Sequence, residues 1–186
     1  MLSAAPHQVI KSLRQRPPTH VKVGFNLLSA HLSLQKCRPW HMDGTSNKAV
    51  DNAVTLEELF KGRRVALFGV PAPFTGTCTT AHVPPYNKHA DAFASKVDEL
   101  VCYTVADPYC HHNWAKSMGV DTSKLSFMCD PTGEVASAWG VEKDYNASSL
   151  GRRSERFSML VDDGKVVSFQ LVDDAAKDAE VLLSQC

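Results

Sequence analysis

Residues 69–86, GVPAPFTGTCTTAHVPPY, directly follow an apolar run and decide how the rest of the sequence is interpreted. Cys78 lies here among threonines and prolines, whereas most buried cysteines have aliphatic neighbours and pack as small apolar groups. The run VALFGV at 65–70 is typical of a buried strand, and residues 79–97 carry apolar side chains at helical spacing. Cys78 is therefore predicted at the start of a helix that follows a strand.

A cysteine at that position faces unpaired backbone N–H groups and the positive end of a helix dipole. Such surroundings, or a nearby cation, lower the pKa of a cysteine from roughly 8.5 to roughly 3.5–7.5. The hydroxyl of Thr75 can turn back and donate a hydrogen bond to the sulfur or to a bound oxygen, and Pro71 and Pro73 stiffen the loop. These residues alone leave two alternatives open, a nucleophilic cysteine and a structural cysteine beside a threonine cap.

Strand and helix patterns alternate from residue 65 onward. The predicted strands are 65–70, 99–106, 125–129 and the two arms of a hairpin over 156–171, and the predicted helices are 79–97, 108–119, a short segment ending at Trp139, and 173–185. Asp107 and Gly119 provide the cap and the stop of the second helix, and Asp163-Gly164 is a strong hairpin turn. The order predicts an α/β fold with a mixed sheet flanked by helices, and it resembles the thioredoxin fold. Only 35–54 looks like a linker.

Length and charge limit the possible classes of protein. The 186 residues are enough for one domain, and no apolar run approaches the roughly 18 residues of a membrane helix. Residues 1–42 carry six basic and no acidic side chains, so the remainder has a charge of 14 − 20 = −6. Because nucleic acid requires a basic face, we expect no nucleic-acid partner. Because no apolar run is long enough for a membrane helix, we expect no membrane partner. Residues 1–20 are expected to be a transit peptide to an organelle or a disordered basic tail.

The six cysteines contain no C-x-x-C pair, which argues against a zinc ribbon and a thioredoxin-type dithiol and favours free thiols in a reducing compartment. Cys102, inside an apolar strand, is expected in the core. Cys110-His111-His112 is not expected to bind a metal, because consecutive residues at a helix start point in different directions. Neither Cys37 nor Cys129 has an evident catalytic environment.

The pattern P-x-x-x-T-x-x-C of Pro71, Thr75 and Cys78, followed by His82 and Pro84, resembles the active-site motif of the peroxiredoxins. FGVPAPFTGTC is most similar to the type 5 subfamily. The segments ELFKGRRVALFGVP, CYTVADPY, CDPTGE and GRRSERFSMLVDDG extend this resemblance, in order, over roughly residues 54–171. The resemblance implies a thioredoxin-like peroxiredoxin domain within 21–186.

The resemblance implies a thiol-dependent peroxidase that reduces hydrogen peroxide and organic hydroperoxides without a cofactor, in antioxidant defence and redox homeostasis. By the same resemblance, Cys78 would become a sulfenic acid, Thr75 would position the peroxide, and Arg156 would be the active-site arginine. A guanidinium near the sulfur stabilises the thiolate and can hold the peroxide oxygens. The alternative is a peroxide sensor that passes its oxidation to a partner.

The loop departs from the family pattern at four positions, which leaves the peroxide preference open: Ala72, Pro73, Gly76 and Pro85. The sulfenic acid must be reduced by a second cysteine or by an outside thiol. The family's resolving loop after the last strand is missing, and Cys186 is the only cysteine in that region. We therefore favour one-cysteine chemistry with glutathione, glutaredoxin or a thioredoxin-like protein as reductant, and keep a resolving Cys186 as the alternative.

The resemblance implies a homodimer, formed through the face near the active site. The location is inferred from the two ends of the sequence. The C-terminal Ser184-Gln185-Cys186 differs from the Ser-Lys-Leu type of peroxisomal address. A mitochondrion or similar organelle is therefore expected before a peroxisome, with the cytoplasm as the alternative.

Overall fold

The computed structural model describes residues 21–29, 31–43, 45 and 47–186, so the possible transit peptide at 1–20 lies outside them. Its strands are β1 (Ser33–Lys36), β2 (Ala53–Thr55), β3 (Arg64–Gly69), β4 (Glu99–Thr104), β5 (Ser126–Cys129), β6 (Glu142–Asp144), β7 (Arg152–Ser154), β8 (Phe157–Asp162) and β9 (Lys165–Leu171). Its α-helices are α1 (Leu56–Phe60), α2 (Val83–Lys88), α3 (Ala90–Ala94), α4 (Pro108–Ser117), α5 (Glu134–Trp139) and α6 (Asp178–Gln185). Short helical turns are η1 (Leu27–Ser29), η2 (Ala49–Asp51), the π-helix η3 (Cys78–His82) and η4 (Asn146–Ser148).

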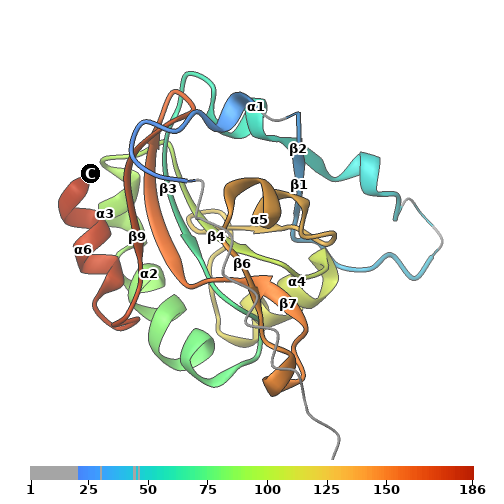
Figure 1. The fold of residues 1–186 in the computed structure, drawn as a ribbon. Helices are drawn as coiled ribbons and strands as arrows, with labels where there is room; N and C mark the ends of the chain where they lie inside the picture. The colour runs from blue at the N-terminus through green and yellow to red at the C-terminus, as the bar shows by residue number, and fades with distance from the viewer. Residues whose placement is uncertain (1–20, 30, 44, 46) are drawn as a thin grey trace, which may run out of the picture.

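A seven-stranded sheet in the order β2-β1-β5-β4-β3-β8-β9 forms the centre of the protein, and β6 and β7 pair separately (Figure 1). β3 runs parallel to β4, and β4 parallel to β5, whereas β8 is antiparallel to β3. The sheet is therefore mixed, as the alternating patterns predicted. None of the helices in the described part of the chain is long and apolar enough to cross a membrane.

Helices cover both faces of this sheet, which is why β3 is apolar at every buried position rather than at every second one. Because side chains alternate along a strand, Val65 and Leu67 pack with α1 and α5 in one apolar cluster. Ala66 and Phe68 point the other way and pack with α2, α3, α4 and α6 in a second cluster. The predicted α/β architecture with a helix-flanked sheet is confirmed.

The predicted helix over 79–97 is wrong as one continuous element, because η3, α2 and α3 replace it. Two consecutive prolines, Pro84 and Pro85, have no N–H to donate to the preceding turn, and the backbone there widens into a π-turn in which Val83 N–H donates to Cys78 O. His89, with φ −96° and ψ 9°, separates α2 from α3. The start of the element at Cys78 is nevertheless where the sequence placed it.

The region 35–54 is only partly a linker, since it contains the end of β1 and most of β2. β1 pairs antiparallel with both β2 and β5, and Cys37 N–H continues the pairing by donating to Phe127 O. These strands have four and three residues, and β1 buries only Leu34. The sequence therefore has no alternating pattern there that would predict them. The predicted hairpin is confirmed, with Asp163 and Gly164 at φ 45° and 75° in its turn.

A buried histidine and a buried cysteine form a pair in the core away from Cys78. His111 in α4 has its Nδ1 3.0 Å from Cys129 Sγ, and its ring stacks on Trp114 and meets the edge of Phe127. Burial lowers the pKa of His111 to about 3 and raises the pKa of the Cys129 thiol well above its usual value. Both groups are therefore neutral near pH 7, and this pair is a core contact.

Stability should fall on mild acidification because of His111. Its pKa is near 6.5 when the chain is unfolded and about 3 when folded, so below pH 6.5 the unfolded state binds the extra proton. Between pH 7.5 and 5.5, the free energy of unfolding of the wild type should fall by about 1 kcal/mol more than that of His111→Phe. Urea unfolding at the two pH values measures this, and equal losses in both proteins would contradict it.

Candidate active site

Cys78 begins η3 at the end of the loop that leaves the central strand β3. Its side chain is only 1% exposed. Phe74, in the same loop, has φ 58°, a conformation that bulky residues rarely adopt, and its ring is 57% exposed. Such strain persists only where the surroundings fix the backbone, so the loop presents Cys78 in one defined geometry.

Arg156 comes from a segment far along the chain and reaches the sulfur of Cys78. It directly precedes β8, and the antiparallel register pairs Gly69 with Phe157, which brings Arg156 to the start of the cysteine loop. Its Nη2 donates to Cys78 Sγ over 3.3 Å. A permanently charged guanidinium at this distance favours the thiolate, so two of the candidates from the sequence lie together.

Thr75 lies in the same turn, but its hydroxyl is used differently from the prediction. Its Oγ1 donates to Ala72 O over 2.9 Å and does not donate to the sulfur, and its carbonyl accepts from Thr79 N–H. The Trp114 indole N–H in turn donates to Thr79 Oγ1 over 3.0 Å. The hydroxyl oxygen of Thr75 can still accept a hydrogen bond, because a hydroxyl has two lone pairs.

Two further groups belong to this site. His82 Nδ1 lies 2.8 Å from Arg156 Nη1, and His82 Nε2 lies 2.8 Å from Asp178 Oδ2 at the start of α6. His82 is part of the motif that the sequence indicated, without a role assigned to it. Asp178 was missed, because it is one of several acidic residues in DDAAKDAE and no spacing distinguishes it. Only its burial, at 2% exposure, singles it out.

The other five cysteines lack such surroundings, and all six are free thiols. Cys102 is fully buried, which confirms its predicted place in the core. Burial is the largest influence on the pKa of each of these five thiols and raises it: Cys37, Cys102, Cys110, Cys129 and Cys186. Among the residues that the structure describes, no group of three or more His, Cys, Asp or Glu side chains could hold a metal ion.

Cys186 lies at the opposite end of the sheet from Cys78. Its thiol donates to Leu182 O, and the charges that act on it are Arg64 and Lys96. Arg64 is the first residue of β3, whereas Cys78 follows the last, and a strand of this length spans roughly 20 Å. Because a disulfide needs Cα atoms within about 7 Å, the resolving role that was kept as an alternative would require α6 to leave its place.

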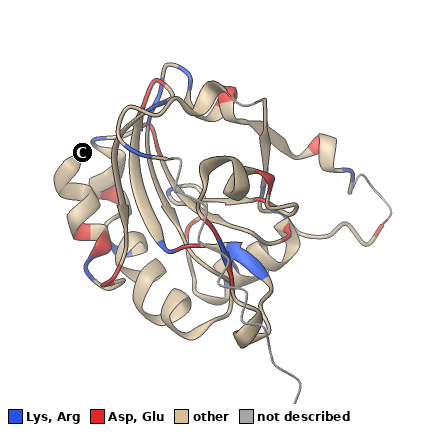
Figure 2. Cartoon of the chain, viewed as in Figure 1, with Lys and Arg blue, Asp and Glu red and all other residues tan. Residues whose placement is uncertain are grey.

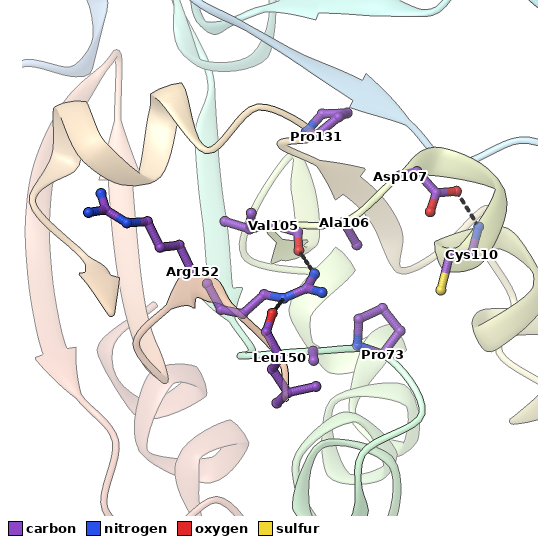
Figure 3. A pocket seen from close by; sticks show the side chains of 10 residues that line it. Pro73, Val105, Ala106, Asp107, Cys110, Pro131, Leu150 and Arg152 are labelled. Carbon is purple, nitrogen blue, oxygen red and sulfur yellow. Dashed lines mark hydrogen bonds between the residues drawn. The ribbon is translucent and has the colours of Figure 1, made fainter. Parts of the chain in front are cut away.

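A pocket of about 460 Å³ borders the cysteine loop at Ala72 and Pro73. Figure 3 shows Asp107 and Cys110 of the α4 start on one side and Arg152 of β7 on the other. Arg153 also lines the pocket, and its guanidinium is held in place because it donates to the carbonyls of Leu150 and Val105. β7 is the basic strand in Figure 2, while acidic and basic residues are otherwise interspersed over the described chain.

The Redoxin family profile matches residues 42–183. The chain is 39% identical over 160 residues to Peroxiredoxin-2F, mitochondrial, of Arabidopsis thaliana, a match that covers 83% of this chain and 77% of the relative. It is 36% identical over 169 residues to Peroxiredoxin-2F, mitochondrial, of Oryza sativa subsp. japonica, covering 87% and 83%.

Solved structures resemble the whole described domain. Reduced Prx3 in complex with H2O2 from Vibrio vulnificus superimposes with a TM-score of 0.75 at 26% identity, covering 89% of this chain and 99% of that one. Peroxiredoxin 5 from Alvinella pompejana gives a TM-score of 0.72 at 25% identity, with the same coverage. These likenesses confirm the predicted thioredoxin-like fold.

Proposed function

Because the chain belongs to the peroxiredoxin family, in its type 5 subfamily, and is a thiol-dependent peroxidase, we propose that Cys78 is its peroxidatic residue. The observation that carries the proposal is the hydrogen bond from Arg156 Nη2 to Cys78 Sγ. Of the five other cysteines, each has a pKa raised by burial, which disfavours the nucleophilic thiolate.

The proposed reaction transfers one oxygen to sulfur. The Cys78 thiolate attacks the nearer oxygen of the peroxide, an S–O bond forms and the O–O bond breaks. Sulfur is oxidised by two electrons to sulfenic acid, and the leaving oxygen departs as alkoxide or hydroxide and takes up a proton. Arg156 stabilises the charge as it moves from sulfur to the leaving oxygen, and Thr75 Oγ1 accepts a hydrogen bond from the bound peroxide.

Peroxiredoxins act on peroxides with thioredoxin-like reductants, and the finer assignments for this chain are proposals. We propose hydrogen peroxide and alkyl hydroperoxides as substrates, and glutathione, glutaredoxin or a thioredoxin-like protein as the thiol that reduces the Cys78 sulfenic acid. The position of Cys186 at the other end of the sheet supports this external route. The alternative role of a peroxide sensor is not favoured.

Two further proposals concern assembly and place in the cell. A homodimer formed through the face near the active site is supported by the exposed ring of Phe74 there. A mitochondrion or a similar organelle is supported by the two relatives named mitochondrial, with the cytoplasm as the alternative. Residues 1–20, which would carry the address, lie outside the described chain.

Intact-mass spectrometry after one equivalent of hydrogen peroxide tests the proposed function. Without added thiol, we expect the reduced protein to gain one oxygen, located on Cys78 by peptide mapping. A loss of two hydrogens within one chain would instead identify a second cysteine as resolver. If the protein does not react, or reacts equally after Cys78→Ser, the proposed role of Cys78 is wrong.

A further inference from the structure

A line of hydrogen bonds, buried between Asp178 and His82 and partly buried at Arg156, connects the C-terminal helix α6 to Cys78. Asp178 accepts from His82 Nε2 over 2.8 Å, His82 Nδ1 lies 2.8 Å from Arg156 Nη1, and Arg156 Nη2 lies 3.3 Å from Cys78 Sγ. We propose that Asp178 and His82 are positioning residues that hold the Arg156 guanidinium against Cys78. This inference rests on the proposed peroxidatic role of Cys78.

The surroundings of Asp178, the first residue of this line, keep its carboxylate ionised. Its oxygens accept hydrogen bonds from four side chains on four elements: His82 of η3, Tyr86 of α2 (2.6 Å), Ser158 of β8 (2.7 Å) and Gln170 of β9 (2.8 Å). Burial by itself raises the pKa of Asp178, but the hydrogen bonds from these neighbours outweigh it and bring the pKa below its usual value. The carboxylate is therefore charged at neutral pH, and its position is fixed from several directions.

The two neighbours of His82 determine where its proton lies. An ionised carboxylate can only accept a hydrogen bond, so Nε2 carries the hydrogen toward Asp178. A guanidinium can only donate, so Nδ1 must present its lone pair to Arg156. Burial lowers the pKa of His82, more than the hydrogen bond to Asp178 raises it. His82 is therefore a neutral ring with one defined tautomer, which turns an acceptor toward Arg156.

This acceptor sets the direction of the guanidinium. The donors of an arginine are fixed in one plane, so anchoring Nη1 on His82 also fixes the direction in which Nη2 points. Without Asp178, the His82 ring loses the carboxylate that holds Nε2–H, so Nδ1 no longer presents its lone pair to Arg156 in one defined direction. The guanidinium would then turn away from the sulfur, and Cys78 would lose the cation that stabilises its thiolate.

The Asp178→Ala variant tests this proposal through the sign of its effect. The readout is the pH midpoint of Cys78 alkylation by iodoacetamide, followed by peptide mass spectrometry without any peroxide. If Asp178 acted by its charge alone, removing an anion would favour the thiolate and move the midpoint to lower pH. If it positions Arg156, the midpoint rises by about one unit, which is about a tenfold fall in the ionisation constant of the thiol.

Further variants separate positioning from a general loosening of the fold. Leu182→Ala removes a fully buried contact of the same helix and should weaken its packing without moving the midpoint. His82→Phe keeps a ring beside Phe68, removes both nitrogens, and should raise the midpoint as Asp178→Ala does. The double variant should match His82→Phe, because Asp178 acts only through His82.

The outcomes distinguish the two proposals. A midpoint that stays or falls in Asp178→Ala, or an equal rise in Leu182→Ala, would overturn the positioning role. If Asp178→Ala does not fold, the midpoint of His82→Phe decides in the same way. Peroxidase turnover that survives in Cys78→Ser would refute the proposed function instead, and it would leave the alkylation result intact.

Discussion

Cys78→Ser is expected to reduce peroxide turnover to the background of the assay, a loss on the order of 10⁴-fold or more, as when an enzyme loses its nucleophile. A serine hydroxyl is not ionised at neutral pH, and an alcohol cannot pass through the sulfenic acid that carries the oxygen in this chemistry. Arg156 cannot compensate, because a guanidinium next to a neutral hydroxyl has no anion to stabilise. Steady-state consumption of hydrogen peroxide with glutathione and glutaredoxin, or with a thioredoxin system, measures this loss.

Cys37→Ser is the matched control for that experiment. Cys37 is half-buried and packs against the apolar cluster that contains the buried Cys78, and burial raises the pKa of its thiol. Turnover should stay within about twofold of the wild type, since replacing a cysteine near the surface by serine changes the stability of the fold little. Retained turnover in Cys78→Ser together with a loss in Cys37→Ser would place the chemistry at another thiol.

Arg156→Met is expected to lower kcat/KM for hydrogen peroxide by about 10²–10³-fold, the usual cost of removing one preorganised donor from a reacting centre. Methionine keeps much of the length of the side chain and removes both the charge near Cys78 Sγ and the donor to His82 Nδ1. The rate of the first oxidation step should fall as much as turnover does. Stopped-flow loss of tryptophan fluorescence or competition for peroxide measures that step.

Arg156→Lys shows whether charge or geometry matters more. Lysine keeps the cation but cannot donate along two parallel directions, to His82 and to Cys78 at once, so most of the loss should remain. Arg152→Met is the control, because this arginine is largely exposed and forms an ion pair with Glu142 over 2.5 Å at the surface. Equal rates in the lysine variant and the wild type would show that a positive charge is enough, without the two donor groups of the guanidinium.

Much of the fold could be predicted because it rests on local patterns. The continuous apolar runs of β3 and β4, the Asp107 cap of α4 and the Asp163-Gly164 turn each reflect a physical preference of the residues themselves. The short strands β1 and β2 were missed, since they take their stability from pairing with β5 and with each other rather than from their own side chains.

The candidate site divides in the same way. The position of Cys78 after a strand, at the start of a helical turn and three residues after Thr75, can be predicted from local sequence, because strand, loop and turn are properties of one continuous segment. The contact of Arg156 with the sulfur was decided by the antiparallel register of β3 and β8, which joins residues 78 positions apart. The place of Asp178 under His82, and of Cys186 far from Cys78, was decided by how α6 packs on the sheet. Packing of this kind depends on the total buried surface of many residues, and no single stretch of sequence carries it.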